Sequence, residues 1–585
     1  MITPMQKVYI LIYHRALQGF LERLRYLGMV HIDIQQEQQP DRYAGAIRYI
    51  GRIKSVLKNL TAEPTAADDH TDVNPHTIVA DWEQSSHRAD ELNGQLQSVR
   101  QNIQKYAPWG DFDPDTLRGL REAAGITVRL FIVHNKHFEP SQWKHVFYST
   151  VRQDAYYRYV IVFQKDTVID AESLRAEEVI IPDSSLAELR KQESVLVHQL
   201  DDLHKQLTAF GTYRRLLEAE LKKRESALEF KQVSEGLSHG AADHVFILKG
   251  WIPRNKKDEL ASMLNAEDVA YHITAPDIED PVPVKLNNSR FSRLFEPITR
   301  LFDLPKYREI DLTPFFAPFF TLFFGFALAD AGYGIIIFII SMVMSLRVKS
   351  SYKKLCYLGV IMGLSTSLVG LITGTVFGID TSTSTAMRRL VIFNQNQLFY
   401  FSLLLGFIQV IYGMIIKVIN TTIQFGFKHA LPTVGWLSII TGGILYAMLD
   451  PRPGYVMIGV GVSLILFFND FKSNIFIRLG KGLWELYGIT GIVGDVLSYV
   501  RIFALGLSSS ILGFVINDIA GEIRAVPVAG FVLAFVFLVF GHTTNLLLSS
   551  LSSFVHPLRL TFVEFYKNAG FSGGGREYKP FTTFN

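Results

Sequence analysis

The apolar and polar positions of this 585-residue chain are distributed very unevenly. The first half is rich in Lys, Glu, Asp, Arg and Gln, whereas long stretches from about residue 313 onward carry almost no charge. A helix crosses the hydrocarbon core of a bilayer with about 20 apolar residues, and several stretches reach that length. The pattern therefore predicts a water-soluble N-terminal half followed by an all-α membrane half.

Turn signals and charges divide the second half into eight apolar runs. We expect transmembrane helices over 314–329, 334–346, 355–379, 398–419, 430–449, 455–468, 483–519 and 526–567. The last two are longer than a membrane requires, so they must tilt, bend or project from it. The first two are joined at Asp330-Ala331-Gly332-Tyr333-Gly334. We interpret Asp330, Gly332 and Gly334 as structural residues there, with the glycines supplying the turn.

The first half carries a long heptad pattern. Its seam positions are Leu186, Leu189, Leu196, Leu200, Leu203, Leu207, Phe210, Leu217, Leu221 and Leu228. This spacing predicts a coiled coil whose antiparallel partner is the helical segment over 41–106. A compact helical bundle is the alternative, but the heptads extend over more than six repeats. Strand-like runs at 7–12, 28–32, 126–165 and 244–251 predict small α/β lobes at the ends of the stalk.

The predicted fold is thus an α+β cytoplasmic arm joined to an all-α membrane domain. We place the arm at 1–290, a junction at 291–312 and the transmembrane domain at 313–585. The apolar run at the N-terminus is too short for a signal peptide, which places the arm in the cytoplasm. With one cysteine, Cys356, no internal disulfide is expected. The formal net charge of +3 gives no reason to expect nucleic acid as a partner.

Basic loop residues favour one orientation, with both termini cytoplasmic. On the expected cytoplasmic side lie Arg347, Lys349, Lys353, Lys354, Lys417, Lys428, Lys472, Arg478, Lys481, Lys567, Arg576 and Lys579. The opposite loops hold Arg388, Arg389, Arg452 and Arg524.

Motifs of common soluble active sites are absent from the sequence. There is no GxxxxGK[ST] phosphate loop, no HExxH, no paired CxxC and no GxSxG. We therefore expect no catalytic site, no metal and no cofactor in this chain.

Two arginines, Arg501 and Arg559, interrupt the last two apolar runs. A cation inside a membrane span is costly, so it usually has a function. On a helical wheel at about 100° per residue, other polar residues share a sector with each arginine. The sectors hold Asp495, Ser498, Arg501 and Ser508 on the first helix, and His542, Asn545, Ser549, Ser552, His556 and Arg559 on the second. Such stripes are typical of a proton or ion path.

A structural interpretation stands beside this one. Arg501 could pair with Asp495, and Arg559 with Glu564, simply to hold the helices together. For His542 and His556, both interpretations remain: interhelical hydrogen bonding or a role in ion transfer. Glu485 and Asp330 are each either a path residue or a helix-end residue, and we favour the path for Glu485. Pro557 leaves the carbonyl of Ser553 without its helical partner, which allows a bend beside Arg559.

The stretches around the arginines, SYVRIFALGLSSS and FVHPLRLTFVEF, resemble the last two helices of subunit a, or subunit I, of V-type and A-type rotary ATPases. Further stretches that are similar to this family are YREIDLTPFFAPFFTLFFGFALADAGYG, ILKGWIP, PVKLNN and LGMVHI. The resemblance covers nearly the whole chain, and the modest length points to a bacterial or archaeal complex. Leu312 stands where the family often has Pro, and Ser549, Ser552 and Ser553 where it often has acidic residues.

The resemblance implies a non-catalytic stator subunit in the prokaryotic inner (plasma) membrane. It would face a rotating proteolipid ring, with Arg501 and Arg559 forcing ring carboxylates to release their ion and separating two half-channels. The half-channel candidates are Asp495, Ser498, Ser508, His542, Asn545, Ser552, His556, Glu564 and Glu485. The other implied partners are peripheral-stalk subunits, a central-stalk subunit at the ring, and membrane lipid. The resemblance leaves open whether protons or sodium ions move, and whether ATP is made or hydrolysed.

Two other functions fit a multi-span protein. A secondary transporter would bind its substrate at broken helices and is expected to show inverted repeats, which we do not find in the sequence. A membrane-anchored scaffold would use the coiled coil to recruit partners, but it leaves both arginines and their stripes unexplained.

Overall fold

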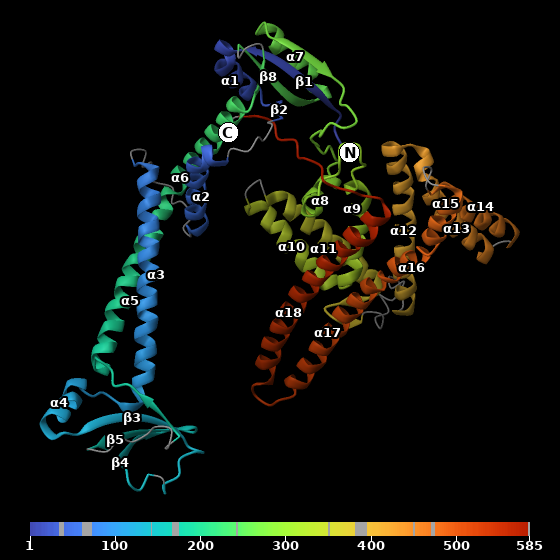
Figure 1. Ribbon diagram of the computed structural model, residues 1–585. Coiled ribbons are helices and arrows are strands. Elements are labelled where there is room, and N and C mark those ends of the chain that lie inside the picture. The colour runs from blue at the N-terminus through green and yellow to red at the C-terminus, as the bar shows by residue number, and fades with distance from the viewer. Residues whose placement is uncertain are drawn as a thin grey trace. The chain divides into compact units, whose positions relative to one another are not determined.

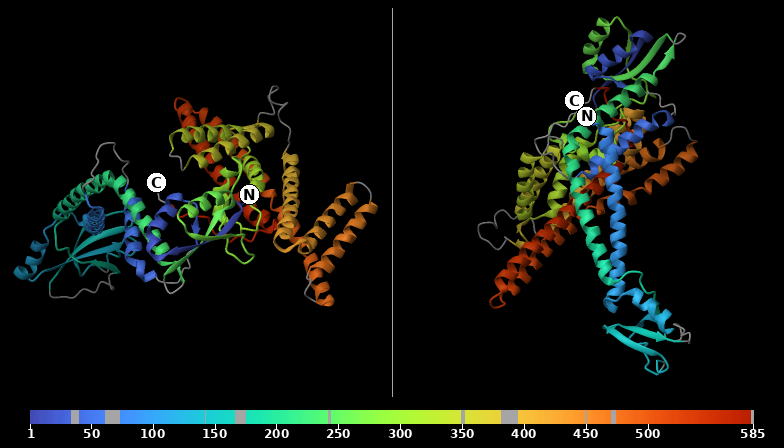
Figure 2. Two further views of the ribbon diagram at one scale, coloured as in Figure 1. Left: turned by 90° about the horizontal axis from the view of Figure 1, so that it is seen from above. Right: turned by 90° about the vertical axis from the view of Figure 1, so that its left-hand side faces the viewer.

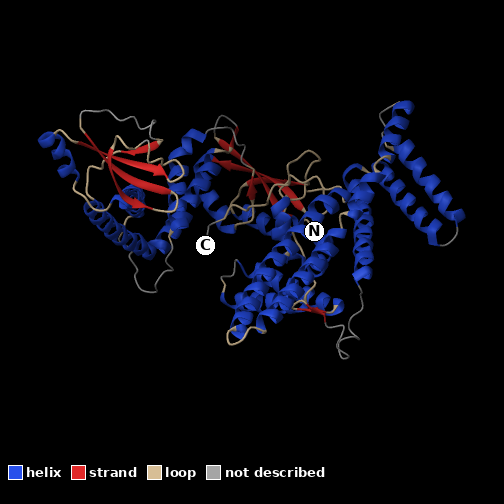
Figure 3. Ribbon diagram, turned by 90° about the horizontal axis from the view of Figure 1, so that it is seen from below, coloured by secondary structure: helices blue, strands red, loops and turns tan. Residues whose placement is uncertain are grey.

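The computed structural model describes the chain except for residues 34–39, 61–72, 142, 166–174, 241–243, 349–351, 381–394, 449–450, 470–473 and 583–585. Of the loop residues named above, Lys349, Arg388, Arg389 and Lys472 lie outside the described part. The chain forms two compact units. The first combines Met1–Asp33 with Leu237–Thr582, and the second is Ile34–Gly236. Each unit contains one of the two larger sheets (Figure 3).

The first unit begins with an antiparallel sheet in the order β2-β8-β1-β9, with β7 also paired to β8. The strands are β1 (Met5–Tyr13), β2 (His31–Ile32), β7 (Ser238–Gly240), β8 (Val245–Pro253) and β9 (Ala270–Thr274). Side chains of β1 alternate, so that Val8, Ile10 and Ile12 are buried. Helices α1 (Leu17–Leu27) and α7 (Lys257–Ala266) accompany the sheet. The strands predicted at 7–12 and 244–251 are confirmed.

The second unit is built on two helices, α3 (Pro75–Tyr106) and α5 (Leu186–Ala209), which lie side by side (Figures 1 and 2). They are antiparallel, because Leu92 and Leu96 pack against Leu200 while Arg100 bonds Glu193 at 2.8 Å. Helices α2 (Ala44–Asn59) and α6 (Arg214–Glu235) pack against each other in the same unit. A 3₁₀ turn at Phe210–Tyr213 separates α5 from α6, so the heptad pattern from Leu186 to Leu228 extends over two helices.

A smaller sheet completes the second unit, in the antiparallel order β4-β5-β3-β6. Its strands are β3 (Thr127–His134), β4 (Phe147–Gln153), β5 (Tyr157–Gln164) and β6 (Ala176–Val179), preceded by α4 (Pro114–Ala124). Phe131, Val133, Val160 and Val162 of the central strands form the core of this lobe with Trp143. The strands predicted within 126–165 are confirmed.

The rest of the first unit is almost entirely helical. The junction helix is α8 (Glu296–Phe302), and the helices of the apolar half are α9 (Thr313–Leu328), α10 (Ala331–Arg347), α11 (Lys353–Thr373), α12 (Gln395–Phe425), α13 (Phe427–Met448), α14 (Pro451–Phe468), α15 (Ile475–Leu486), α16 (Ile489–Leu497), α17 (Val500–Arg524), α18 (Gly530–Arg559) and α19 (Tyr566–Asn568). A short hairpin, β10 (Thr375–Val376) and β11 (Ile379–Asp380), follows α11. Within the described ranges, six helical stretches are long and apolar enough to cross a membrane, while α9 and α10 are shorter apolar helices.

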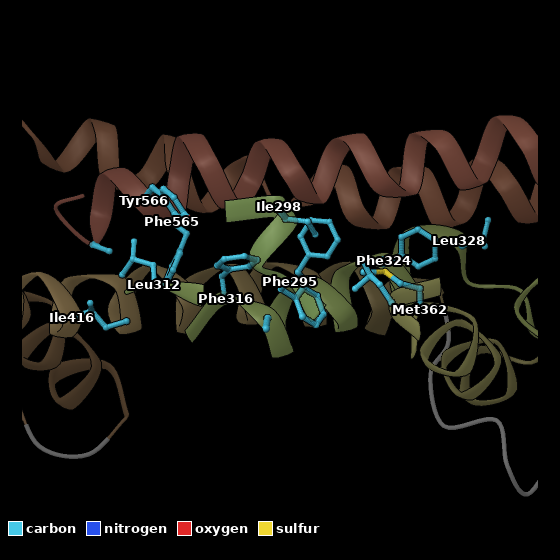
Figure 4. Packing of buried hydrophobic residues seen from close by; sticks show 14 of the residues in the cluster. Phe295, Ile298, Leu312, Phe316, Phe324, Leu328, Met362, Ile416, Phe565 and Tyr566 are labelled. Carbon is cyan, nitrogen blue, oxygen red and sulfur yellow. The ribbon is translucent and has the colours of Figure 1, made fainter. Parts of the chain in front are cut away.

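Phenylalanine side chains of α9 form the centre of the membrane half. Phe316 and Phe320 are fully buried and pack against Phe295, which precedes the junction helix α8. Tyr566, from the last helix, joins the same cluster (Figure 4). Aromatic rings at these separations add favourable edge-to-face contacts to the burial itself. The cluster therefore fixes the last helices against α9.

The run over 483–519, which was expected to tilt, bend or project, lies in one apolar stretch that is divided into α15, α16 and α17. At the divisions the chain makes tighter bonds, from the Gly488 N–H to the Glu485 carbonyl at 2.9 Å and from the Ile502 N–H to the Tyr499 carbonyl at 3.1 Å. Tyr499 stands at the second break and is fully buried. A Cβ on Gly406 of α12 would lie 2.4 Å from its ring, so packing of this ring accompanies the break.

The turn between α9 and α10 also differs from its prediction. Ala329 supplies the left-handed conformation, with φ of 47°, and Asp330 caps α10. Gly332 and Gly334 lie inside α10 instead. A Cβ on Gly334 would lie 2.4 Å from the Ser367 nitrogen of α11, and one on Gly332 would lie 2.6 Å from the Phe377 ring. The glycines therefore allow close packing and do not make the turn.

Residues 570–582, which we call the tail, connect the helical half to the sheet of the first unit. The Glu309 carboxylate accepts hydrogen bonds from the Ser572 and Gly573 N–H groups at 2.7 and 3.2 Å. Farther along, the Tyr578 N–H donates to the Val284 carbonyl at 3.0 Å and the Phe581 N–H to the Val30 carbonyl at 2.8 Å. The tail thus runs from the last helix to the edge of the sheet beside β2.

Candidate functional site

The antiparallel packing of α17 and α18 brings the two arginines together. The helices lie side by side along their length (Figures 1 and 2). Arg501 is near the start of α17 and Arg559 is the last residue of α18, so both lie at the same end of the pair. Both are close enough to act electrostatically on His556 and Glu564. The structure therefore brings together four of the polar residues selected from the sequence.

Neither arginine forms an ion pair within the described part of the chain. No Asp or Glu oxygen of the described residues lies within 4.0 Å of either guanidinium, so the pairings of Arg501 with Asp495 and of Arg559 with Glu564 are absent. Arg501 is half-buried, and its buried Nη1 has no hydrogen-bond partner. Arg559 is exposed. Arg501 is therefore a half-buried cation without a counter-ion among the described residues, an arrangement that is costly inside a membrane.

Asp495 has other partners than the predicted ones. Its carboxylate accepts from Lys567 Nζ at 3.0 Å and from Asn568 Nδ2 at 2.8 Å. The break between α16 and α17 explains this, because it removes Asp495 from the wheel that carries Arg501. Asp495 and Glu485 both line a cavity of about 300 Å³, together with Lys417 and Lys567. The two acidic candidates thus share one polar cavity at the end of the helices from which the tail departs.

Glu564 lies on a single π-helical turn, Leu560–Phe565, directly after Pro557 and Arg559. Such turns often occur at functional sites. Its side chain is only 3% exposed, and its Oε2 has no partner among the described residues. Ser498 is a neighbour of the carboxylate, and its hydroxyl donates to the Gly494 carbonyl at 3.0 Å. Glu564 is therefore a buried carboxylate with a free oxygen, near both arginines but outside ion-pair distance.

Two residues beside Glu564 were missed in the sequence. Gln409 of α12 is fully buried, and neither its oxygen nor its nitrogen has a hydrogen-bond partner in the described residues. Tyr499 is equally buried with a free hydroxyl. Gly406 contacts the Tyr499 ring and Gly413 contacts Asn568, so Gln409 lies between these two neighbours on one face of α12. A glutamine inside the apolar run over 398–419 was the signal that could have found it.

These free polar atoms have a common physical consequence. Buried polar groups are nearly always hydrogen-bonded, to protein or to ordered water. A site that is polar and roomy holds water, whereas an apolar cavity of similar size stays dry. The cavity lined by Asp495, Glu485, Lys417 and Lys567 meets the first description and can therefore hold water.

A second polar cluster lies farther along α17 and α18, toward the loop between them. The Tyr333 hydroxyl bonds His542 Nδ1 at 2.7 Å and accepts from Asn545 Nδ2 at 2.9 Å. His542 Nε2 bonds Asn517 Oδ1 at 3.1 Å. Ser549 donates to Asn545 Oδ1 at 2.9 Å. Tyr333 and Asn517 were missed in the sequence, and they connect the predicted His542 and Asn545 to α10 and α17.

The remaining candidates have simpler surroundings. Asp330 is a buried helix cap whose oxygens accept the N–H groups of Tyr333, Phe377 and Gly378 at 2.8–3.0 Å. Ser552 is half-buried. Ser508 is exposed, whereas its neighbour Ser509 is buried and offers its carbonyl to Asn545. Ser508 lies seven residues after Arg501 within α17, so it shares the face of that arginine, whereas Ser509 faces α18.

Comparison with known proteins gives consistent matches. A family model described as "V-type ATPase 116kDa subunit family" matches residues 168–367. V-type ATP synthase subunit I 1 of Treponema pallidum is 26% identical over 99% of this chain and 100% of its own length. A-type ATP synthase subunit I of Methanocaldococcus jannaschii is 28% identical over 72% of this chain and 66% of its own length. The crystal structure of a cytoplasmic N-terminal domain of subunit I, homolog of subunit a, of V-ATPase covers 46% of this chain and 99% of its own, with 14% identity and a TM-score of 0.23.

The sequence matches and the apolar helices define a membrane subunit of a rotary ATPase. Within that class, residues 168–367 match the V-type ATPase 116 kDa subunit family, and the chain is similar to subunit I of bacterial V-type and archaeal A-type ATP synthases.

Proposed function

We propose that this chain is the stator wall of the ion path in a V/A-type rotary ATPase, coupling ion flow to ATP synthesis or hydrolysis. Its partner in the membrane is a rotating ring of proteolipid subunits, each with a carboxylate. The observation that carries the proposal is the absence of ion pairs for Arg501 and Arg559 within the described residues. A carboxylate arriving on the ring would supply the missing counter-ion.

The chemistry follows from the charge. A cation within about 4–6 Å lowers the pKa of a carboxylate by about 1–3 units. A ring carboxylate beside the arginines therefore gives up its ion, and it takes up another only after moving past them. The polar residues around Asp495 and Glu564 form the half-channel at the arm side, and those around His542 form the other. The arginines between them prevent ions from crossing without rotation.

We further propose that residues 1–290 form the cytoplasmic arm and that its second unit anchors the peripheral stalks. The central-stalk subunit lies at the ring, and the membrane is the prokaryotic inner membrane with both termini cytoplasmic. The long helix pair of α3 and α5 supports this, because it carries at one end the β3–β6 lobe, whose strand β4 is largely exposed.

Arg559→Ala is expected to reduce ATP-driven ion uptake by at least about tenfold. Loss of the positive field changes the pKa of the ring carboxylate by about one unit, which corresponds to a tenfold change in ion release. The measurement is ion uptake into membrane vesicles, with subunit content checked by blotting. Arg524→Ala, which removes an exposed arginine at the other end of α17, is the matched control and should leave uptake unchanged. If the variant fails to assemble into the complex, instead of assembling and failing to pump, the proposed role is contradicted.

Removal of the β3–β6 lobe tests the arm. Tyr106 and Leu186 end antiparallel helices, so a short Gly-Ser turn can replace residues 107–185. The truncated protein is expected to keep the ring but lose the peripheral-stalk subunits, since their anchor is gone. Affinity purification followed by mass spectrometry measures both. Arg501→Gln is the complementary control, which should retain the stalks and lose transport. Retention of the stalks without the lobe would contradict the assignment.

A further inference from the structure

We propose that Tyr333 and His542 form the proton-carrying pair of the half-channel remote from the arm, and hence that the transported ion is a proton. This inference rests on the proposed function. It concerns the second polar cluster, in which Tyr333 of α10, Asn517 of α17 and His542 and Asn545 of α18 meet.

The hydrogen bonds fix the tautomer of His542. Asn517 Nδ2 donates to the Phe377 carbonyl at 2.7 Å, so Asn517 Oδ1 is an acceptor. His542 Nε2, 3.1 Å from this oxygen, must then carry a hydrogen. His542 Nδ1 is left as an acceptor, and the Tyr333 hydroxyl donates to it at 2.7 Å. Asn545 Nδ2 in turn donates to the Tyr333 oxygen at 2.9 Å.

This arrangement can pass a proton in one balanced step. The Tyr333 O–H bond breaks as its proton bonds to His542 Nδ1, while the hydroxyl oxygen takes a proton from a hydronium ion on its other side, which leaves neutral water. The imidazolium releases its Nε2 proton to a water molecule toward the loop between α17 and α18. One proton has then crossed the pair, and a flip of the ring that exchanges the places of its two nitrogens prepares the pair for the next proton. The reverse sequence carries a proton inward.

The same cluster offers little to a sodium ion. A hard cation needs several free oxygen ligands. Both oxygens of the Asp330 carboxylate, the nearest anionic group, are taken by three backbone N–H groups. Asn517 Oδ1 accepts from His542, and Asn545 Oδ1 accepts from Ser549. The groups left to act are a hydroxyl and an imidazole, which both donate and accept hydrogen bonds.

A row of free hydroxyls continues from this pair toward the arginines. Ser509 Oγ of α17 and Ser550 Oγ and Ser553 Oγ of α18 are buried without a partner among the described residues. His556 Nδ1 and Arg501 Nη1, which follow toward the arginines, are also buried without a partner among the described residues. Each such atom requires a water molecule. The row thus supplies the water that Tyr333 needs on its inner side, and it ends at the arginines.

The test uses the assembled complex in membrane vesicles, with ATP-driven acidification followed by a pH-sensitive dye in sodium-free buffer. The wild-type complex is expected to acidify the lumen, and a protonophore should collapse the gradient. His542→Gln and Tyr333→Phe keep the size of each side chain but cannot pass a proton, so each should slow acidification by about a hundredfold. Thr543→Val, on an exposed neighbour in α18, is the control and should pump normally.

A rescue measurement excludes a merely structural role. Added imidazole should restore part of the acidification by His542→Ala, whereas it should have no effect on Tyr333→Phe. Wild-type rates in both substituted complexes, with Arg501→Gln inactive, would overturn the proton pair but leave the stator role intact. Uptake that requires sodium and survives the protonophore would overturn the choice of proton. Normal transport by Arg501→Gln would overturn the proposed function itself.

Discussion

Replacing Arg501 with lysine is expected to reduce ATP-driven ion uptake almost as completely as replacing it with glutamine. Lysine keeps the charge, but its ammonium is compact, strongly hydrated and prone to lose its proton when buried. Arg501 is half-buried, has an unpartnered Nη1 and forms no ion pair with the described residues. A guanidinium stays charged there, and its planar fork can hold a passing carboxylate through two hydrogen bonds. We expect ion uptake to fall at least about tenfold for both variants, which corresponds to a change of one unit in the pKa of the ring carboxylate.

The assay is ion uptake in vesicles that carry the assembled complex, with assembly verified by blotting. Arg524→Lys is the matched control, because Arg524 lies at the exposed end of the same helix. If Arg501→Lys pumps close to the wild-type rate, a point charge is sufficient and the bidentate mechanism is wrong.

Asp330→Ala is expected to cause the largest loss of stability of any single substitution in the membrane half. Its carboxylate, 1% exposed, accepts three backbone N–H groups and thereby joins the start of α10 to the hairpin after α11. Hydrogen bonds to a charged group contribute about 1.5–3 kcal/mol each, and loss of the acceptor leaves buried donors unpaired. The free energy of unfolding should therefore fall by about 3 kcal/mol or more.

The measurement is the thermal midpoint of the purified complex in detergent, which should drop by several degrees for Asp330→Ala. Asp330→Asn, which keeps one acceptor oxygen, should lie between that variant and the wild type. Asp518→Ala removes an exposed carboxylate on α17 and is the control without an expected shift. Equal midpoints for Asp330→Ala and Asp518→Ala would show that the cap has no stabilising role.

The features that depend on local pattern could be predicted from the sequence. Alternating apolar residues located β1 and β8, and hydropathy located the apolar helical stretches of the membrane half, but not the divisions within 483–519. The two arginines could be identified because a charge is conspicuous in an apolar run. His542 and Asn545 were found for the same reason, as polar residues at helical spacing.

Features that depend on neighbours far away in sequence could not be predicted. An ion pair of Asp495 with Arg501 was considered because a helical wheel assumes an unbroken helix. The break at Tyr499 is accompanied by packing of its ring against α12. Gly334 reads as a turn residue, yet its role is set by the approach of Ser367. Nothing in the local sequence distinguishes Tyr333 or Asn517. Their role depends on the packing of α10, α17 and α18, which brings both to the imidazole of His542.

The tail has a consequence for the order in which the protein is made. Strand β1 leaves the ribosome first, but its partner β8 follows more than two hundred residues later, and the tail reaches the edge beside Val30 after every apolar helix has been synthesised. Contacts of such long sequence separation form late and slowly. All five strands of the sheet are made before the first apolar helix begins at Thr313, so the sheet itself can close before the membrane half is inserted. The edge beside Val30 receives the tail only after the last residues have been made, so docking of the tail is one of the final events of folding.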